Sequence, residues 1–407
     1  MRSRLVDSSG EQLGRVDDLI VRLADEAYPP LTGVKARIGG REVFVPADRI
    51  AALGPGRVQL LGEKVDLGRF ERREGEVLLR EDLLKRRMIN VVGARLVRAN
   101  DLVLGQVEGW WRVVGVDTRF RSFLRRQLPA PVRKRAGVQP FLDWSSIEPF
   151  VGHVPTARLK MGFGRLAKLH PAQIADLVEA ASHEEGEEII DAVAADREFE
   201  ADVFEELDPE HQVEFLGARS DAQAAKILGA MEADDAADLI GELDQERREP
   251  VLKLLPWRTQ RKVRTLLGYN PATAGGLMSP DFVWLAEIRT VADALEELRR
   301  TDLPEESITT VFTVDHDGRL SGVISVVSLL RRRPATLLAE AKSPPPLVFE
   351  TDDELSEIAT RMADYDLMIA PVVDERGALV GIVSVDDLLE MLIPDVWRRR
   401  LNAFANE

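Results

Sequence analysis

A twelve-residue repeat in the middle of the chain constrains the fold more than any other feature of the sequence. From Asp196 the sequence divides into six consecutive units of twelve residues, and the eighth position of every unit is apolar. These eighth residues are Val203, Phe215, Ile227, Leu239, Val251 and Val263. Units open on pairs such as Asp208-Pro209 and Ser220-Asp221, which are typical helix starts. The repeat predicts short helices that cannot bury an apolar face alone and therefore stack into a superhelix.

A second duplication lies in the C-terminal third of the chain. Residues 310–330 superpose on residues 369–389 at an offset of 59, which pairs Gly322 with Gly381. An amphipathic segment precedes each copy, and each copy holds two β-branched runs around an Asp-Gly or Arg-Gly turn. The pattern predicts two copies of the order helix, strand, turn, strand, helix.

The N-terminal part is also duplicated. Residues 5–16 align with residues 96–107 at an offset of 91, and each half closes on a similar segment, VFVPADRI or PFLDWSSI. Short alternating runs broken by Gly and Asp predict strands and hairpin turns. We therefore expect a duplicated small β unit, a pair of barrels, up to about residue 150.

Charge and composition exclude several classes of function. Residues 170–250 hold 25 Asp and Glu against five Lys and Arg, an excess of -20, whereas the whole chain carries -16. This acidic middle would repel nucleic acid and concentrate divalent cations. The chain has no cysteine, no secretory signal and no run of about 18 apolar residues that could span a membrane. We expect a cytoplasmic protein without a transmembrane segment.

Three parts of the sequence resemble known families. The C-terminal duplication is similar to a tandem pair of CBS motifs. Together with the acidic repeat and the junction YNPATAGGLM at residues 269–278, it resembles the cytosolic half of MgtE magnesium transporters. The N-terminal halves resemble PRC barrels. No pore domain follows residue 394, so we expect no conduction by this chain alone.

The resemblance implies a multi-domain α+β fold with four parts. We expect a PRC-barrel-like region of two halves at 1–155 and an MgtE N-like acidic helical superhelix at 156–268. A C-terminal α/β CBS pair at 269–395 and a tail at 396–407 complete the prediction.

The resemblance to MgtE proteins also implies that Mg2+ bridges carboxylates of the helical domain and the CBS pair. Carboxylates on the two sides repel when bare, and a hard cation with a preference for oxygen can link them. The candidate ligands are Asp234, Asp235 and Asp238 in the repeat and Asp386, Asp387 and Glu390 in the last CBS helix. The alternative is a solvated acidic face with helix caps.

The second CBS copy carries a further candidate site. Nucleotide-binding CBS motifs have the pattern Gly-x-x-Ser/Thr-x-x-Asp, which this copy keeps as Gly381, Ser384 and Asp387. The first copy has Ser328 in place of the carboxylate. We expect at most one adenine nucleotide per pair. Alternatively, these residues form the connection between a strand and the following helix and cap that helix. Asp387 is a candidate in both sites, so the metal and the nucleotide would compete for it.

The sequence offers no catalytic motif, so we expect no enzyme. The leading interpretation is a regulatory protein that senses Mg2+, forms a homodimer through the CBS pair and acts on a separate partner such as a membrane transporter. For the dimer we expect an apolar surface from Leu295, Leu298, Leu329, Leu330, Leu388, Leu389 and Met391. In the alternative, the PRC-like region is an adaptor that docks on RNA, ribosome or membrane. For the basic segment 121–135 we favour a solvated loop of the second barrel, and binding to anionic lipid or RNA is the alternative.

Overall fold

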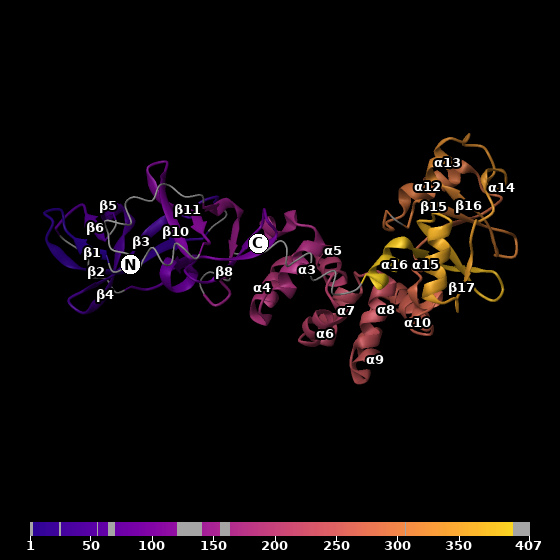
Figure 1. Cartoon of the computed structure of the whole chain (residues 1–407), viewed down its shortest axis with the longest axis horizontal. Coiled ribbons are helices and arrows are strands. Elements are labelled where there is room, and N and C mark those ends of the chain that lie inside the picture. Colours follow the sequence, from indigo (N-terminus) through magenta and orange to yellow (C-terminus); the bar gives the residue numbers. More distant parts are fainter. Residues whose placement is uncertain are drawn as a thin grey trace. The chain divides into compact units, whose positions relative to one another are not determined.

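The computed structural model divides the chain into two compact units, Met1–Glu206 and Leu207–Glu407 (Figure 1). The residues that it describes are 3–23, 26–54, 56–63, 70–119, 141–154, 163–305 and 307–393. The predicted basic segment 121–135, the predicted boundary at 155/156 and the predicted tail 396–407 lie outside the described residues.

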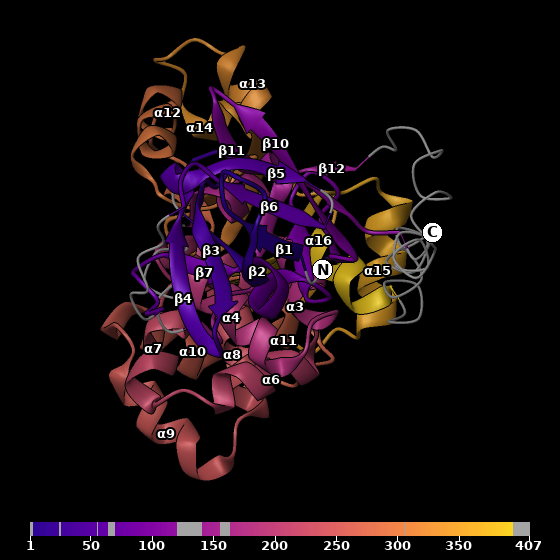
Figure 2. The same ribbon diagram turned by 90° about the vertical axis from the view of Figure 1, so that its left-hand side faces the viewer.

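The first part of unit 1 is β-rich, as predicted. Its strands are β1 (Ser3–Val6), β2 (Gln12–Arg22), β3 (Leu31–Ile38), β4 (Arg41–Pro46), β5 (Ile50–Gly54), β6 (Arg57–Leu60) and β7 (Glu76–Leu78). They form one sheet in the order β4-β3-β2-β1-β6-β5, with β7 paired to β2, and most of it faces the viewer in Figure 2. The π-helical turn η2 (Leu79–Leu83) leads out of this half.

The second half of the β-rich part forms two three-stranded sheets, β10-β11-β12 and β13-β8-β9. Its strands are β8 (Arg87–Asn90), β9 (Arg95–Arg98), β10 (Asp101–Val107), β11 (Trp110–Asp117), β12 (Leu142–Asp143) and β13 (Ile147–Pro149). The two similar closing segments each contain a strand, a 3-10 turn and a strand, with the turns η1 (Ala47–Arg49) and η3 (Trp144–Ser146). Buried residues of both halves, from Val21 to Trp144, form one shared core.

The described helices of unit 1 follow the β-rich part, and one of them packs directly on it. They are η5 (Phe163–Lys168), α3 (Pro171–Glu179), α4 (His183–Val193) and α5 (Arg197–Glu205). Arg87 of β8 forms an ion pair with Glu185 of α4 and donates to the carbonyl oxygen of Ala180, 3.0 Å away. Glu188 of α4 accepts from the backbone N–H groups of Val151 and Gly152 at 2.8 and 2.9 Å. The β-rich part and the first helices are therefore joined by direct hydrogen bonds.

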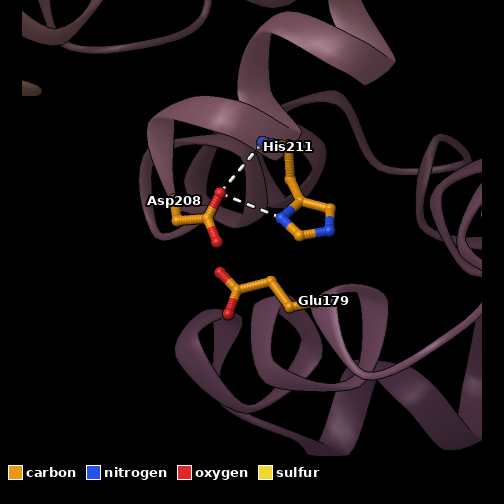
Figure 3. Close-up of side chains that lie close together, drawn as sticks. All are labelled: Glu179, Asp208 and His211. Atoms are coloured by element: carbon orange, nitrogen blue, oxygen red, sulfur yellow. Dashed lines mark hydrogen bonds and ion pairs between the residues drawn. The ribbon is translucent and has the colours of Figure 1, made fainter. Parts of the chain in front are cut away.

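Unit 2 begins with five helices of the repeat. They are α6 (Pro209–Gly217), α7 (Asp221–Leu228), α8 (Ala233–Glu242), α9 (Gln245–Leu254) and α10 (Trp257–Leu266). The first residue of each twelve-residue unit is the N-cap of its helix, so the predicted period is confirmed. Figure 3 shows one cap in detail, where Asp208 Oδ1 accepts from the backbone N–H of His211 and lies 2.9 Å from its Nδ1.

The apolar positions of the repeat are buried, as the stacking argument requires. Every eighth residue from Val203 to Val263 is at most 3% exposed. The twelfth position of the last unit, Leu267, is 39% exposed, because no further repeat helix follows to cover it. The repeat therefore ends at α10, and a different structure begins after it.

The CBS pair contains two copies of one unit. The first holds β14 (Val283–Ala286), α12 (Val291–Arg300), β15 (Thr310–Val314), β16 (Leu320–Ser325), α13 (Val326–Leu330) and α14 (Leu338–Ala341). The second holds β17 (Phe349–Glu350), α15 (Leu355–Asp364), β18 (Ile369–Val373), β19 (Leu379–Ser384) and α16 (Val385–Leu392). The sheets β14-β15-β16 and β17-β18-β19 have the same order, and the predicted turns place Gly318 and Gly377 at φ +79° and +78°.

The junction at 269–278 binds to the second CBS copy. Its short helix α11 (Ala274–Leu277) donates from Ala274 N and Gly275 N to carbonyl oxygens of Asp353 and Thr351, both at 2.8 Å. A side chain at Gly275 would collide with the ring of Tyr269, since a Cβ there would lie 2.7 Å from its Cδ1. The adjacent glycines Gly275 and Gly276 thus allow the junction to pack closely against Tyr269 and Asn270 at its start and against the second CBS copy. Among the described residues, no helix combines the length and apolar character needed to cross a bilayer.

Candidate acidic site between α8 and α16

The site begins with Asp234 in the first turn of α8. The alanines and branched side chains of α8 face the helical core, with Ala233, Ala236 and Leu239 at most 3% exposed. Asp234 lies beside this apolar face and is half-buried. Its Oδ1 is fully enclosed and has no hydrogen-bond partner in the described structure. A carboxylate oxygen in such a position is costly unless a cation or a proton compensates for it.

Other carboxylates surround Asp234 and add to this cost. Burial raises the pKa of Asp234 from 3.8 to about 7, with further contributions from the negative charges of Asp387 in α16, Asp281 before β14 and Asp238 in α8. Lys262 of α10 forms an ion pair with Asp281 and offsets part of this charge. The structure therefore brings the predicted residues Asp234 and Asp387 together across the contact between the helical domain and the CBS pair.

Asp387 also takes part in a helix cap. Ser384 Oγ accepts from the backbone N–H of Asp387 at 3.1 Å, and an Asp387 carboxylate oxygen accepts from the N–H of Ser384 at 3.3 Å. This reciprocal pair is a capping box at the start of α16. Gly381 lies against the junction, because a Cβ there would be 2.5 Å from Sδ of Met278. The predicted nucleotide motif thus has an observed structural role in addition to any binding role.

The remaining predicted ligands lie around this pair without forming a closed metal cage. Asp235 is half-buried and Asp238 exposed on α8, and Asp386 is exposed on α16. The side chain of Glu390 lies outside the described residues. Among the described residues, no three of the predicted ligands bring donor atoms within 4.8 Å of one another. An enclosed carboxylate oxygen with hard oxygen donors around it fits a divalent cation that keeps part of its water shell.

Sequence reasoning missed two residues of this site. Asp281 follows the junction directly, and Lys262 lies in α10, distant from both predicted acidic groups in sequence. Asp281 belongs to no repeat or motif, and Lys262 occupies the seventh position of its repeat unit, which varies from unit to unit. Their role depends on how α10 packs beside α8, which no local pattern in the sequence reveals.

Comparisons with known proteins agree with this architecture. The model of the MgtE intracellular N domain matches residues 169–272, and the CBS domain model matches residues 274–335 and 338–394. This part of the chain is an MgtE N domain followed by a CBS pair. The resemblance of residues 1–155 to PRC barrels stays a prediction.

Curated relatives include magnesium transporters of the MgtE type. The MgtE of Thermus thermophilus is 38% identical over 195 residues, which is 47% of this chain and 43% of that protein. The MgtE of Bacillus subtilis is 29% identical over 192 residues, which is 47% of this chain and 43% of that protein. The chain thus spans less than half the length of these relatives.

Solved structures match the same region. The cytosolic domain of the Mg2+ channel MgtE in complex with ATP has a TM-score of 0.53 and 35% identity, covering 56% of this chain and 93% of that one. The soluble part of a magnesium transporter has a TM-score of 0.52 and 27% identity, covering 56% and 90%. The fold predicted for the helical domain and the CBS pair is therefore confirmed.

Proposed function

We propose that this protein is a Mg2+-responsive regulator in which the cation links α8 of the MgtE N domain to α16 of the CBS pair. The observation that carries the proposal is the enclosed, unpartnered Oδ1 of Asp234 beside the charge of Asp387. The printed descriptions of the relatives as magnesium transporters support the choice of ion.

The physical basis is a balance between repulsion and bridging. Without a cation, the negative charges of Asp234, Asp387 and Asp281 repel and weaken the contact between the two domains. Asp234 and Asp387 would hold the ion, in part through water, and Asp235, Asp238, Asp386 and Glu390 are further candidate ligands. When bound, Mg2+ supplies positive charge with a preference for oxygen donors. The contact then becomes dependent on the concentration of the divalent ion.

The direct test is a titration with Mg2+ followed by calorimetry and by the thermal unfolding midpoint. We expect Mg2+ to bind the wild-type chain and raise its midpoint. Asp234→Asn and Asp387→Asn should each weaken binding by about tenfold or more, because each removes a charged oxygen donor. Asp302→Asn, at an exposed position in the first CBS copy, is the control. Equal binding by all four proteins would reject the bridge and favour an adaptor with a structural MgtE-like half.

We also propose that the second CBS copy binds an adenine nucleotide through Ser384 and Asp387. The observation in support is that a similar MgtE cytosolic domain was solved in complex with ATP. An acceptor at Asp387 is needed for ribose hydroxyls, so Asp387→Ala should abolish ATP binding measured by calorimetry. Asp387→Asn keeps an acceptor oxygen both for the Ser384 N–H and for a ribose hydroxyl, so it should retain ATP binding in part. An ATP affinity of Asp387→Ala equal to that of the wild type would reject the site.

Partners and location complete the proposal. The likeness to a cytosolic domain supports a cytoplasmic location. We further propose that the protein forms a homodimer through its CBS pair and regulates a separate membrane transporter. The surface predicted for the dimer needs a correction, since Leu329 and Leu388 are at most 2% exposed and belong to the core of a single chain. Leu330 and Met391 stay exposed and would lie in the interface. A monomeric mass in light scattering would count against the dimer.

A further inference from the structure

α10 differs in charge from the helices that precede it in the repeat. It carries Arg258, Arg261, Lys262 and Arg264 and has no acidic residue. α8, against which α10 packs, carries four acidic residues and no basic one (Figure 1). The acidic helical domain therefore ends in a cationic helix.

In the described structure, carboxylate partners are seen for two of these cations and for the other two none is seen. Lys262 and Arg264 each form an ion pair. Within the part of the chain that the structure describes, Arg258 and Arg261 have no carboxylate partner, and both are exposed. The guanidinium of Arg258 lies over the indole of Trp257, 5.4 Å from its centroid. Their charge is available to another molecule.

These side chains share one face of the helix. At about 100° per residue, Trp257, Arg258 and Arg261 lie within a sector of roughly 100°, whereas the buried Val263 points the other way. Trp257 is 67% exposed, and Leu254 at the end of α9 is 54% exposed. Two exposed large apolar side chains thus flank the turn between α9 and α10, and Arg258 follows one of them directly in the sequence.

We propose that the surface formed by Leu254, Trp257, Arg258 and Arg261 binds a bilayer that contains anionic lipids. Trp has an apolar ring and a polar N–H, which suits the headgroup region, and Arg attracts anionic headgroups. At physiological ionic strength a charge acts over about 8 Å, so the distant acidic residues of the chain are screened at this surface, where the exposed Arg258 and Arg261 would meet the headgroups. A nucleic acid would satisfy the arginines and leave the exposed Leu254 without an apolar environment, which favours the lipid.

Sedimentation with vesicles tests this surface. Vesicles of phosphatidylcholine, alone or mixed with phosphatidylglycerol, are incubated with the full chain at about 0.15 M salt, so that distant acidic residues are screened, and with EDTA, so that no divalent bridge contributes. We expect binding to the mixed vesicles alone, with loss at high salt. Arg258→Gln/Arg261→Gln should lower the partition coefficient by about tenfold or more, because each basic residue near the surface contributes to binding. Trp257→Ala should lower it as well.

A matched control distinguishes binding through this surface from a general effect of removing positive charge. Arg299→Gln/Arg300→Gln removes two exposed arginines that pair with Glu296 of α12 and should leave binding unchanged. Trp284→Ala removes a Trp that is 55% exposed in β14 and serves the same purpose. Absence of binding to the mixed vesicles, equal binding to both vesicles, or an equal loss in the controls would overturn the proposal. So would binding of an RNA oligomer through the same residues without binding to vesicles. Because EDTA is present, none of these results depends on the Mg2+ site.

Discussion

Asp234 ionises at a cost in free energy, because its Oδ1 is enclosed and other carboxylates lie around it. Part of this residue's role could be predicted from the sequence, since the spacing of Asp234 and Asp238 places both in one acidic helix. The burial of its Oδ1 could not be predicted, because it depends on how α8 packs against α16 and the segment before β14. Asp281 illustrates the same limit, as its proximity arises from tertiary packing alone.

The raised pKa of Asp234 predicts a pH dependence of stability. Its pKa is 3.8 in the unfolded chain and about 7 in the folded one, so the folded state binds more protons in this range and stability falls as pH rises from about 4 to about 7. At about 1.36 kcal/mol per pKa unit, the loss above pH 7 is up to ~4 kcal/mol. Asp234→Asn should therefore stabilise the chain by up to ~4 kcal/mol at pH 8 and by less than half of that at pH 5.

Urea unfolding without divalent cations at both pH values measures this difference. Asp302→Asn, an exposed Asp in unit 2, is the control and should give the same small change at both. A stability gain for Asp234→Asn that is equal at pH 5 and pH 8, or a loss at pH 8, would show that the residue is not held in a costly charged state.

At the scale of elements, repeats made the helical domain and the CBS pair predictable. A period of twelve with an apolar eighth residue specifies both helix starts and the buried face, and the caps at Asp208 and Ser220 confirm it. The N-terminal duplication was less informative. The β-rich region was predicted, but its halves share a core and differ in strand pairing, which alternating short strands do not specify.

The glycines of unit 2 provide a prediction on packing. Gly381→Ala should destabilise the chain by about 1–3 kcal/mol, because the new Cβ would lie 2.5 Å from Sδ and 2.8 Å from Cβ of Met278. Met278 cannot move away freely, since the next residue, Ser279, exchanges two backbone hydrogen bonds with Ile382. Gly241→Ala in α8 meets no atom within 4 Å and should stabilise the helix by up to about 1 kcal/mol.

Chemical unfolding of both variants beside the wild type checks the sign of each change. The pair is matched, since each variant adds one methyl group in unit 2. If Gly381→Ala were as stable as wild type, the close contact between the junction and the CBS pair would not exist in solution.

For the whole molecule, the arrangement of charge is more informative than its total. The chain carries -16, yet the acidic excess lies in the helical domain, and α10 ends that domain with four cations. In our proposals, this arrangement provides one surface for a divalent cation at α8 and another for an anionic bilayer at α10. The charge excess was evident in the sequence. Which carboxylates lie close together depends on the fold and could not be read from the sequence.

The central claim is that Mg2+ holds α8 against the CBS pair. The chain contains no cysteine, so Glu242→Cys on α8 and Ala363→Cys on α15, both at exposed positions, give a clean pair for spin labels. We expect a short, narrow distance distribution with millimolar Mg2+ and a longer, broader one with K+ at equal ionic strength, because screening weakens repulsion without forming a bridge. Neutralising Asp234, Asp235 and Asp238 to Asn should shorten the distance partly without Mg2+ and reduce its further effect. Identical distributions in Mg2+ and K+ would contradict the claim.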